Sequence, residues 1–70
     1  MKAKNVSILY HDGRVARCFE DRKKCREYMR ARVEEYKSFY TILGEGPSLI
    51  QYKDEFGIEH MFTCEDYDLE

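Results

Sequence analysis

The chain has 70 residues, of which 43% are hydrophobic and 37% are charged, and its formal net charge is −2 at pH 7. This composition excludes a disordered chain of low hydrophobicity, and the length allows one helix layer on one small sheet but little room for a deep active-site pocket. No apolar stretch is long enough to span a membrane, and the N-terminus lacks the apolar core of a signal peptide, so we expect a cytoplasmic protein with no membrane partner.

Two short segments rich in β-branched and aromatic residues predict a first β-hairpin: residues 5–10 and 14–19. Two turns compete between them. A two-residue type I′ turn at Asp12-Gly13 pairs Tyr10 with Val15. A three-residue loop, with Gly13 in a G1 bulge, pairs Tyr10 with Arg14 instead.

The two turns differ in which side chains of the second strand face the helix. The type I′ turn places Arg17 on the face of Val6 and Ile8, which we expect to lie beneath the helix. The bulged loop places Ala16 and Cys18 there and turns Arg17 outward. Burial of an unpaired guanidinium costs several kcal/mol, which exceeds the preference between the turns. The bulged loop is therefore the predicted one.

Residues 21–40 form the only segment long and periodic enough to predict a helix, and Asp21 is the expected N-cap. At about 100° per residue, the apolar side chains gather on one side of this helix: Cys25, Met29, Val33, Tyr36 and Tyr40, with Tyr28 and Phe39 at its edge. Arg32 falls near the middle of this arc. We expect it to meet a carboxylate from the acidic half of the chain, to stack on a tyrosine ring, or to extend past the sheet edge into water.

The clearest break in the chain is the segment 44–47 (GEGP). Two further strands are predicted at residues 48–53 and 58–64, joined as a second hairpin. Residues 65–70 lack apolar periodicity and are expected to form an acidic, flexible tail. The predicted fold is thus an α+β domain over residues 1–64, a small β-β-α-β-β unit with one helix packed on an antiparallel sheet of two hairpins.

Charge is unevenly distributed along this domain. Residues 1–40 hold eleven Lys/Arg and six Asp/Glu, a net charge of +5, and residues 41–70 hold one Lys and eight Asp/Glu, a net charge of −7. Such asymmetry indicates either a charged partner or two halves that neutralise each other within the fold.

Catalytic and metal-binding patterns are weak. The three cysteines form no CxxC pair, and we expect reduced thiols in a cytosolic protein. His60 and Cys64 share a strand face but lie about 13 Å apart, too far for a nucleophile and its base. His11, Asp12 and His60 lack the short paired spacing of a structural zinc site. We therefore predict no enzyme, no cofactor and no metal site.

Protein binding and nucleic-acid binding are the remaining function classes. In the bulged register one helix cannot cover the second sheet face, which leaves an apolar patch, and tyrosine favours surfaces that are half apolar and half wet. The predicted partner-binding residues are the acidic Glu59, Glu65, Asp66 and Asp68 and the apolar or aromatic Leu9, Val15, Phe19 and Tyr67. The alternative is nucleic-acid binding by a basic stripe on the helix: Arg22, Lys23, Arg26 and Arg30.

Protein binding is the preferred hypothesis because two of the basic residues have intrahelical acidic neighbours four positions away, in the pairs Lys23–Glu27 and Arg30–Glu34. We predict a small regulator or inhibitor that docks on a protein through its acidic and aromatic surface, with a homodimer as a further expectation. Small size, high charge and the lack of a catalytic constellation are typical of many phage and mobile-element proteins that block a host enzyme in this way. The likeness rests on these general properties alone, because no sequence motif is shared with such proteins.

Overall fold

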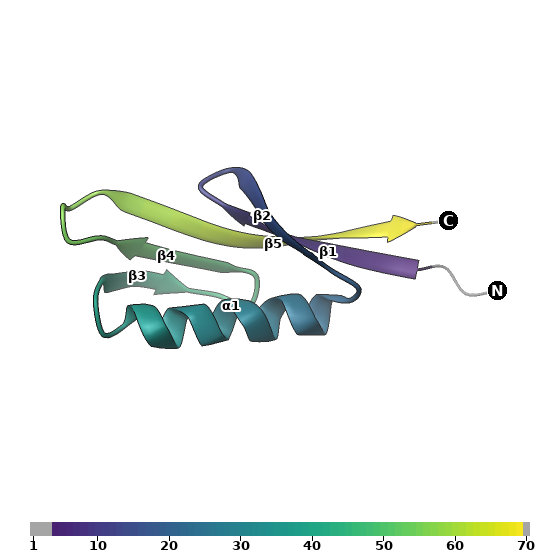
Figure 1. Ribbon diagram of the computed structural model, residues 1–70, viewed down its shortest axis with the longest axis horizontal. Helices are drawn as coiled ribbons and strands as arrows, with labels where there is room; N and C mark the ends of the chain where they lie inside the picture. Colours follow the sequence, from purple (N-terminus) through teal and green to yellow (C-terminus); the bar gives the residue numbers. More distant parts are fainter. Residues whose placement is uncertain (1–3, 70) are drawn as a thin grey trace.

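A computed structural model describes residues 4–69 and shows one helix packed on one face of an antiparallel sheet (Figure 1). The elements in chain order are β1 (Lys4–His11), β2 (Arg14–Phe19), α1 (Arg22–Tyr36), β3 (Thr41–Glu45), β4 (Leu49–Lys53) and β5 (Glu59–Leu69). The strand order is β2-β1-β5-β4-β3. The α+β class, the single helix and both predicted hairpins are confirmed, and the two hairpins join through the pairing of β1 with β5.

Helix α1 begins where the sequence predicts. Asp21 is the N-cap, and its carboxylate accepts a hydrogen bond from the backbone N–H of Lys24 at 2.8 Å, which satisfies one of the free donors of the first turn. The helix ends at Tyr36, earlier than expected, where the backbone tightens: the N–H groups of Ser38 and Phe39 bond to carbonyls three residues back, those of Glu35 and Tyr36. The buried residues of α1 are Cys25, Met29 and Val33, one per turn along the predicted apolar side.

The turn of the first hairpin is the two-residue one, so the predicted bulged loop was wrong. Asp12 and Gly13 have φ angles of 55° and 84°, as a type I′ turn requires, and Tyr10 pairs with Val15. Contacts outside the hairpin stabilise this turn, since the Asp12 N–H donates to the Met61 carbonyl at 2.8 Å and the Asp12 carboxylate accepts from the Met61 N–H at 2.8 Å.

A bulge does occur, but it lies within β2 at Ala16 and not at Gly13. The register shifts between Leu9 and Tyr10, so that Arg17 lies opposite Leu9 and Cys18 opposite Ile8. Leu9 is 0% exposed and belongs to the core beneath α1, and the alternation of a strand therefore places Ile8 on the other face. The predicted assignment of the two faces of β1 was wrong.

Because Arg17 lies opposite Leu9, it is on the helix face of the sheet. Its guanidinium is not buried there, so the desolvation cost that was expected to exclude this position is small. Strand β2 is an edge strand, so the Arg17 side chain reaches solvent past the end of the sheet. Its guanidinium stacks over the rings of Phe19 and Tyr28, 5.7 and 5.0 Å from their centroids, which is a favourable arrangement at a partly exposed site.

Cys18, which the sequence placed beneath the helix, is exposed, whereas Cys25 and Cys64 are buried. We expect Cys18 to react with a thiol reagent such as Ellman's reagent at the rate of an unfolded peptide. Cys25 and Cys64 should react only as the protein unfolds. Stoichiometry and rate of labelling, with and without denaturant, measure this directly. Native labelling of Cys25 before Cys18 would contradict the face assignment.

Two segments of the sheet were not predicted. Residues 41–45, which follow the predicted helix and include the start of the predicted break, form β3, whose Ile42 packs at the margin of the core. Strand β5 continues through Leu69, so residues 65–69 pair with β1 and are not a separate tail. Residue 70, the last of the expected tail, lies outside the described residues.

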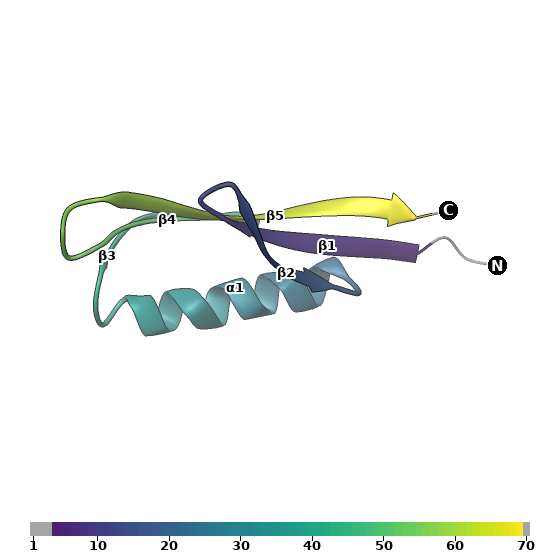
Figure 2. The same ribbon diagram turned by 45° about the horizontal axis from the view of Figure 1, so that its top comes forward.

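The paired ends of β1 and β5 give the molecule an elongated shape of 48 × 19 × 16 Å. Strand β2 pairs with β1 only as far as Ser7, and β4 pairs with β5 only as far as Thr63. A two-stranded ribbon therefore extends beyond α1 (Figure 2). The radius of gyration is 13.1 Å, against about 11 Å for a compact domain of this length.

Candidate functional site

The sheet face opposite α1, which we call the open face, is not covered by any described element (Figure 2). Side chains at alternate positions of β1, β5 and β4 point to it, because successive residues of a strand face opposite sides. Its apolar and aromatic members include Val6, Ile8, Tyr10, Val15, Leu49, Met61 and Tyr67. Val15 is 63% exposed and Tyr67 is 41% exposed.

The open face also carries a polar chain near the protruding ribbon. The Tyr67 hydroxyl lies 3.2 Å from the Tyr10 hydroxyl and donates to the Glu65 carboxylate at 3.0 Å. These hydrogen bonds, with Tyr10 first and Glu65 second, raise the pKa of Tyr67, so the phenol is neutral at ordinary pH. Glu59, a second acid on this face, is the cross-strand neighbour of Lys53 but forms no ion pair with it among the described residues.

The predicted protein-binding residues divide between the two faces. Val15, Tyr67, Glu59 and Glu65 lie on the open face. The other four lie on the helix side of the sheet: Leu9, Phe19, Asp66 and Asp68. The expectation that Leu9 and Phe19 face away from the helix was wrong, because Leu9 is wholly buried and Phe19 packs against the core.

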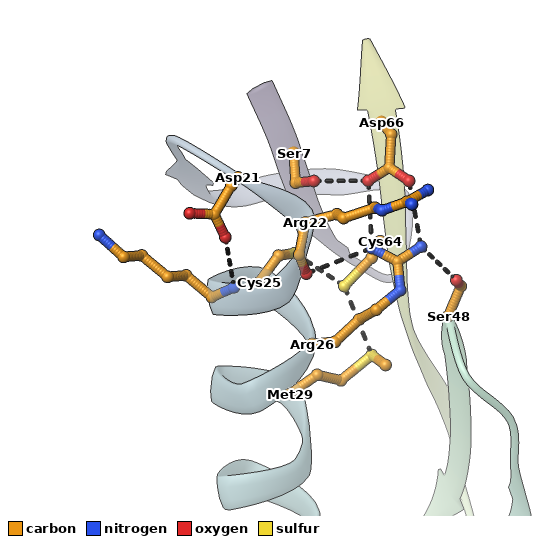
Figure 3. Close-up of polar contacts among 10 residues, drawn as sticks. Ser7, Asp21, Arg22, Cys25, Arg26, Met29, Ser48, Cys64 and Asp66 are labelled. Carbon is orange, nitrogen blue, oxygen red and sulfur yellow. Dashed lines mark hydrogen bonds and ion pairs between the residues drawn. The ribbon is translucent and has the colours of Figure 1, made fainter. Parts of the chain in front are cut away.

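Asp66 holds the helix to the sheet (Figure 3). Its two carboxylate oxygens accept hydrogen bonds from the Arg26 guanidinium, each at 3.1 Å, and one of them also accepts from Ser7 Oγ. Arg26 donates in addition to Ser48 Oγ at 2.6 Å. The bond to Arg26 first, and that to Ser7 second, lower the pKa of Asp66. Asp66 and Arg26 therefore satisfy each other, and neither offers a free charge to a partner.

The intrahelical pairs expected for Lys23 and Arg30 are absent among residues 4–69. The ion pairs of α1 are instead Arg32–Glu35 at 3.2 Å and Lys37–Glu34 at 3.1 Å. Glu34 is engaged by Lys37, so Arg30 loses its expected partner. Three of the four predicted nucleic-acid-binding residues remain exposed without an ion pair in the described part of the chain: Arg22, Lys23 and Arg30.

Arg32 is accommodated mainly by its own helix. Its guanidinium lies over the Tyr28 ring, 5.0 Å from the centroid, as one of the three expectations had it. Its carboxylate partner is Glu35 of the same helix, and not an acid of the C-terminal half. The Nε atom is buried and has no hydrogen-bond partner among the residues that the structure describes.

The two buried thiols meet beneath α1 (Figure 3). Cys25 Sγ donates to Cys64 Sγ at 2.7 Å, and Cys64 Sγ lies 3.8 Å from Met29 Sδ. Burial first, and the contact with Cys64 second, raise the pKa of Cys25 to about 12. Such a thiol is protonated at neutral pH and is a poor nucleophile.

A polar cluster joins the two hairpin turns at the end of the sheet. His60 on β5 lies between two carboxylates, with Nδ1 2.6 Å from Asp12 Oδ2 and Nε2 2.7 Å from Asp54 Oδ2. Carboxylates only accept hydrogen bonds, so both ring nitrogens carry protons in this arrangement. The bond to Asp12 first, and that to Asp54 second, raise the pKa of His60.

His11 on β1 completes this cluster. Its Nε2 lies 2.7 Å from the Tyr52 hydroxyl and 3.8 Å from Asp12 Oδ2, and its ring stacks on Phe62. His11, Asp12 and His60 offer three metal-ligand atoms within 4.8 Å of one another. The sequence spacing concealed this group, because the pairing of β1 with β5 brings together residues that lie 49 positions apart.

No helix among residues 4–69 is long and apolar enough to cross a membrane. Comparisons of the chain with family models, with curated proteins and with solved structures found no match.

Proposed function

We propose that this protein is a non-enzymatic protein-binding module whose open face docks on another protein. The observation that carries the proposal is a sheet with one face covered by α1 and the other left with exposed Val15, Leu49 and Tyr67. Exposed apolar surface of this kind, edged by polar groups, is typical of interaction sites. Tyr10 and Tyr67 fit this use, since tyrosine combines a large apolar ring with a polar end.

The partner we propose has an apolar surface edged by Lys or Arg. Glu65 lies between Tyr10 and Tyr67 on the open face, and Glu59 lies further along β5. Neither acid has a basic ion-pair partner among the described residues. Basic side chains at the matching positions of a partner would complement these charges, which gives specificity and a faster encounter.

A binding role is proposed over a catalytic one because the nucleophile and base candidates are engaged elsewhere. The Cys25 thiol is buried with a pKa of about 12, and both nitrogens of His60 are bonded to carboxylates. Free cysteines support a cytoplasmic location. Regulation or inhibition of the docked protein, in the manner of phage and mobile-element proteins, is the corresponding biological role.

Nucleic-acid binding by α1 is the second candidate. It is favoured by the basic residues of the helix that lack ion pairs among the described residues: Arg22, Lys23 and Arg30. Arg26 contributes little to it, because its guanidinium is bonded to Asp66.

Charge reversal on the two surfaces distinguishes these functions. A tagged protein first captures its partner from cells, and the affinity of the purified pair is then measured by calorimetry at about 150 mM salt. We expect Glu59→Lys with Glu65→Lys to weaken binding tenfold or more, a loss of about 1.4 kcal/mol. The matched control is Arg22→Glu with Arg30→Glu, on the exposed side of α1, which should change affinity less than threefold. Asp66 and Arg26 are left intact because they fasten the helix.

The same variants test the alternatives. If nucleic acid is the ligand, the purified protein binds duplex or single-stranded DNA at about 150 mM salt, and the reversal at Arg22 and Arg30 abolishes that binding. If a second copy of the chain occupies the open face, light scattering shows a dimer that Glu65→Lys dissociates. Either result would overturn docking on a different protein as the function.

A further inference from the structure

We infer that His11, Asp12 and His60 form a binding site for one divalent first-row transition cation, with Zn²⁺ as the preferred ion. The site lies where the β1–β2 turn meets β5, on side chains that the proposed docking function does not use. It rests on the convergence of two imidazoles and one carboxylate whose donor atoms all lie within 4.8 Å of one another.

The spacing of the donor atoms is close to that of a zinc centre. Ligands at about 2.0–2.2 Å from a tetrahedral Zn²⁺ lie about 3.3 Å from one another. In the structure Asp12 Oδ2 lies 2.6 Å from His60 Nδ1 and 3.8 Å from His11 Nε2. These two distances bracket the required one, and the donors of His11 and His60 lie within 4.8 Å of each other. We expect rotation of these side chains to bring the three donors into range.

The backbone under Asp12 is already held in place for this role. Asp12 Oδ1 accepts from the Met61 N–H, and the Asp12 N–H donates to the Met61 carbonyl, both at 2.8 Å. One carboxylate oxygen is thereby anchored to β5, and the other is directed toward the two imidazoles. This arrangement makes Asp12 a one-oxygen ligand at low cost in conformational entropy.

Asp54 supplies the outer support that histidine ligands of metals commonly have. It accepts from His60 Nε2 at 2.7 Å, and its other oxygen accepts from the N–H groups of Phe56 and Ile58 at 2.8 and 3.0 Å. A carboxylate fixed in this way holds the proton on Nε2 and leaves Nδ1 as the ligand atom. The charges also balance, since the dication and two carboxylates sum to zero once His60 gives up its Nδ1 proton.

His11 is oriented for the same purpose. Its ring stacks on Phe62 with centroids 4.3 Å apart, and its Nε2 lies 2.7 Å from the Tyr52 hydroxyl. The cation takes the place of that hydroxyl on the nitrogen lone pair. Asp12 and His60 also line a shallow, open depression with Gln51, Glu59 and Met61, so this side of the site is open to solvent.

The donor set selects the class of cation. Imidazole nitrogens suit Zn²⁺, Cu²⁺ and Ni²⁺, whereas Mg²⁺ and Ca²⁺ require sites made mainly of oxygen atoms. Zn²⁺ also accepts the low coordination number that three protein ligands and one water provide.

Calorimetric titration of metal-free protein with zinc sulfate tests the inference. All samples carry Cys18→Ser, because the exposed thiol could bind zinc by itself. We expect one Zn²⁺ per chain, loss of binding in His11→Gln and in His60→Gln, and a loss of about 10–100-fold in affinity in Asp54→Asn. The matched control is Glu27→Gln, which removes an exposed carboxylate of α1 outside the site and should leave affinity within twofold.

A second measurement needs no substitution of a ligand, so it holds even if a variant fails to fold. Zinc added to the ¹⁵N-labelled protein should shift His11 Nε2 and His60 Nδ1 while leaving the nitrogen signals of the core residues unchanged. Absence of saturable binding, or one-to-one binding that survives both His11→Gln and His60→Gln with both histidine signals unmoved, would overturn the inference.

Discussion

Replacement of Leu9 by alanine is expected to lower the free energy of unfolding by about 3 kcal/mol, a large part of the stability of so small a domain. Leu9 is 0% exposed and packs in the core with Cys25, Met29 and Val33 of α1. Its truncation removes apolar burial and leaves a cavity that close-packed neighbours fill only in part. Urea unfolding followed by circular dichroism measures the change.

The adjacent residue provides a matched control. Ile8 has the same number of side-chain atoms as Leu9 and lies on the same strand, but it points to the open face and is half-buried. Ile8→Ala should therefore cost about 1 kcal/mol or less. A cost for Ile8→Ala equal to or above that for Leu9→Ala would mean that α1 covers the other face of β1, as the sequence had suggested.

The elements that local signals determine were predictable. The N-cap at Asp21 and the spacing of Cys25, Met29 and Val33 follow from capping chemistry and a helical period. The second hairpin was also predicted, and its turn is stabilised locally, because the Asp54 carboxylate accepts from the N–H groups of Phe56 and Ile58. Each of these features depends on residues within one or two turns of chain.

The errors came from features that only the assembled sheet determines. The turn at Asp12-Gly13 was judged by the expected burial of Arg17, but β2 lies at the sheet edge and leaves that side chain in solvent. The pairing of β1 with β5 extends β5 through residues that show no apolar alternation. A strand can form there because its partner supplies the backbone hydrogen bonds, whatever its own side chains favour.

For the candidate sites, too, the residue types could be read from local sequence, whereas their positions depend on the assembled sheet. The sequence identified an acidic and aromatic surface, but the face of each residue depended on which side of β1 the helix covers. Cys18 and Ile8 share a face, as predicted, but α1 covers the opposite face, that of Leu9. The group of His11, Asp12 and His60 was considered and set aside on spacing. Only the pairing of distant strands brings these three side chains together.

Asp66→Asn is expected to lower the free energy of unfolding by about 2 kcal/mol at pH 7, because it leaves the Arg26 guanidinium and the Ser7 hydroxyl without their charged acceptor. About a third of the Asp66 side chain is exposed, at 33%, so solvent screening keeps the loss below that of a fully buried pair. A matched control is Asp68→Asn, on the same face of β5. Asp68 forms no hydrogen bond or ion pair with the described residues.

Because the pKa of Asp66 is lowered in the folded state, its stabilising effect should be greater at neutral pH than at acidic pH. The groups that face it are Arg26 and Arg22 of α1 and Ser7 of β1, and the hydrogen bond to Arg26 is the largest cause of its lowered pKa. A carboxyl group with a lower pKa in the folded state stabilises that state above its unfolded pKa of about 3.9. The contribution is lost as the pH falls through the folded pKa. The difference in unfolding free energy between wild type and Asp66→Asn should thus be constant above about pH 5 and shrink below about pH 4.

A double-mutant cycle separates the pair from its neighbours. Asp66→Asn and Arg26→Met each leave one partner unsatisfied in a partly buried position, whereas the double variant removes both charges. We therefore expect the double variant to be more stable than the sum of the single losses implies, by about 1 kcal/mol or more. Unfolding in urea at pH 7 and at pH 3 gives one coupling energy at each pH. The coupling energy at pH 3 should be smaller, because the Asp66 carboxyl of the unfolded chain is then protonated and ionising it on folding costs free energy. Additive losses at pH 7, or a coupling energy that does not fall with pH, would show that the ion pair does not hold α1 to β5.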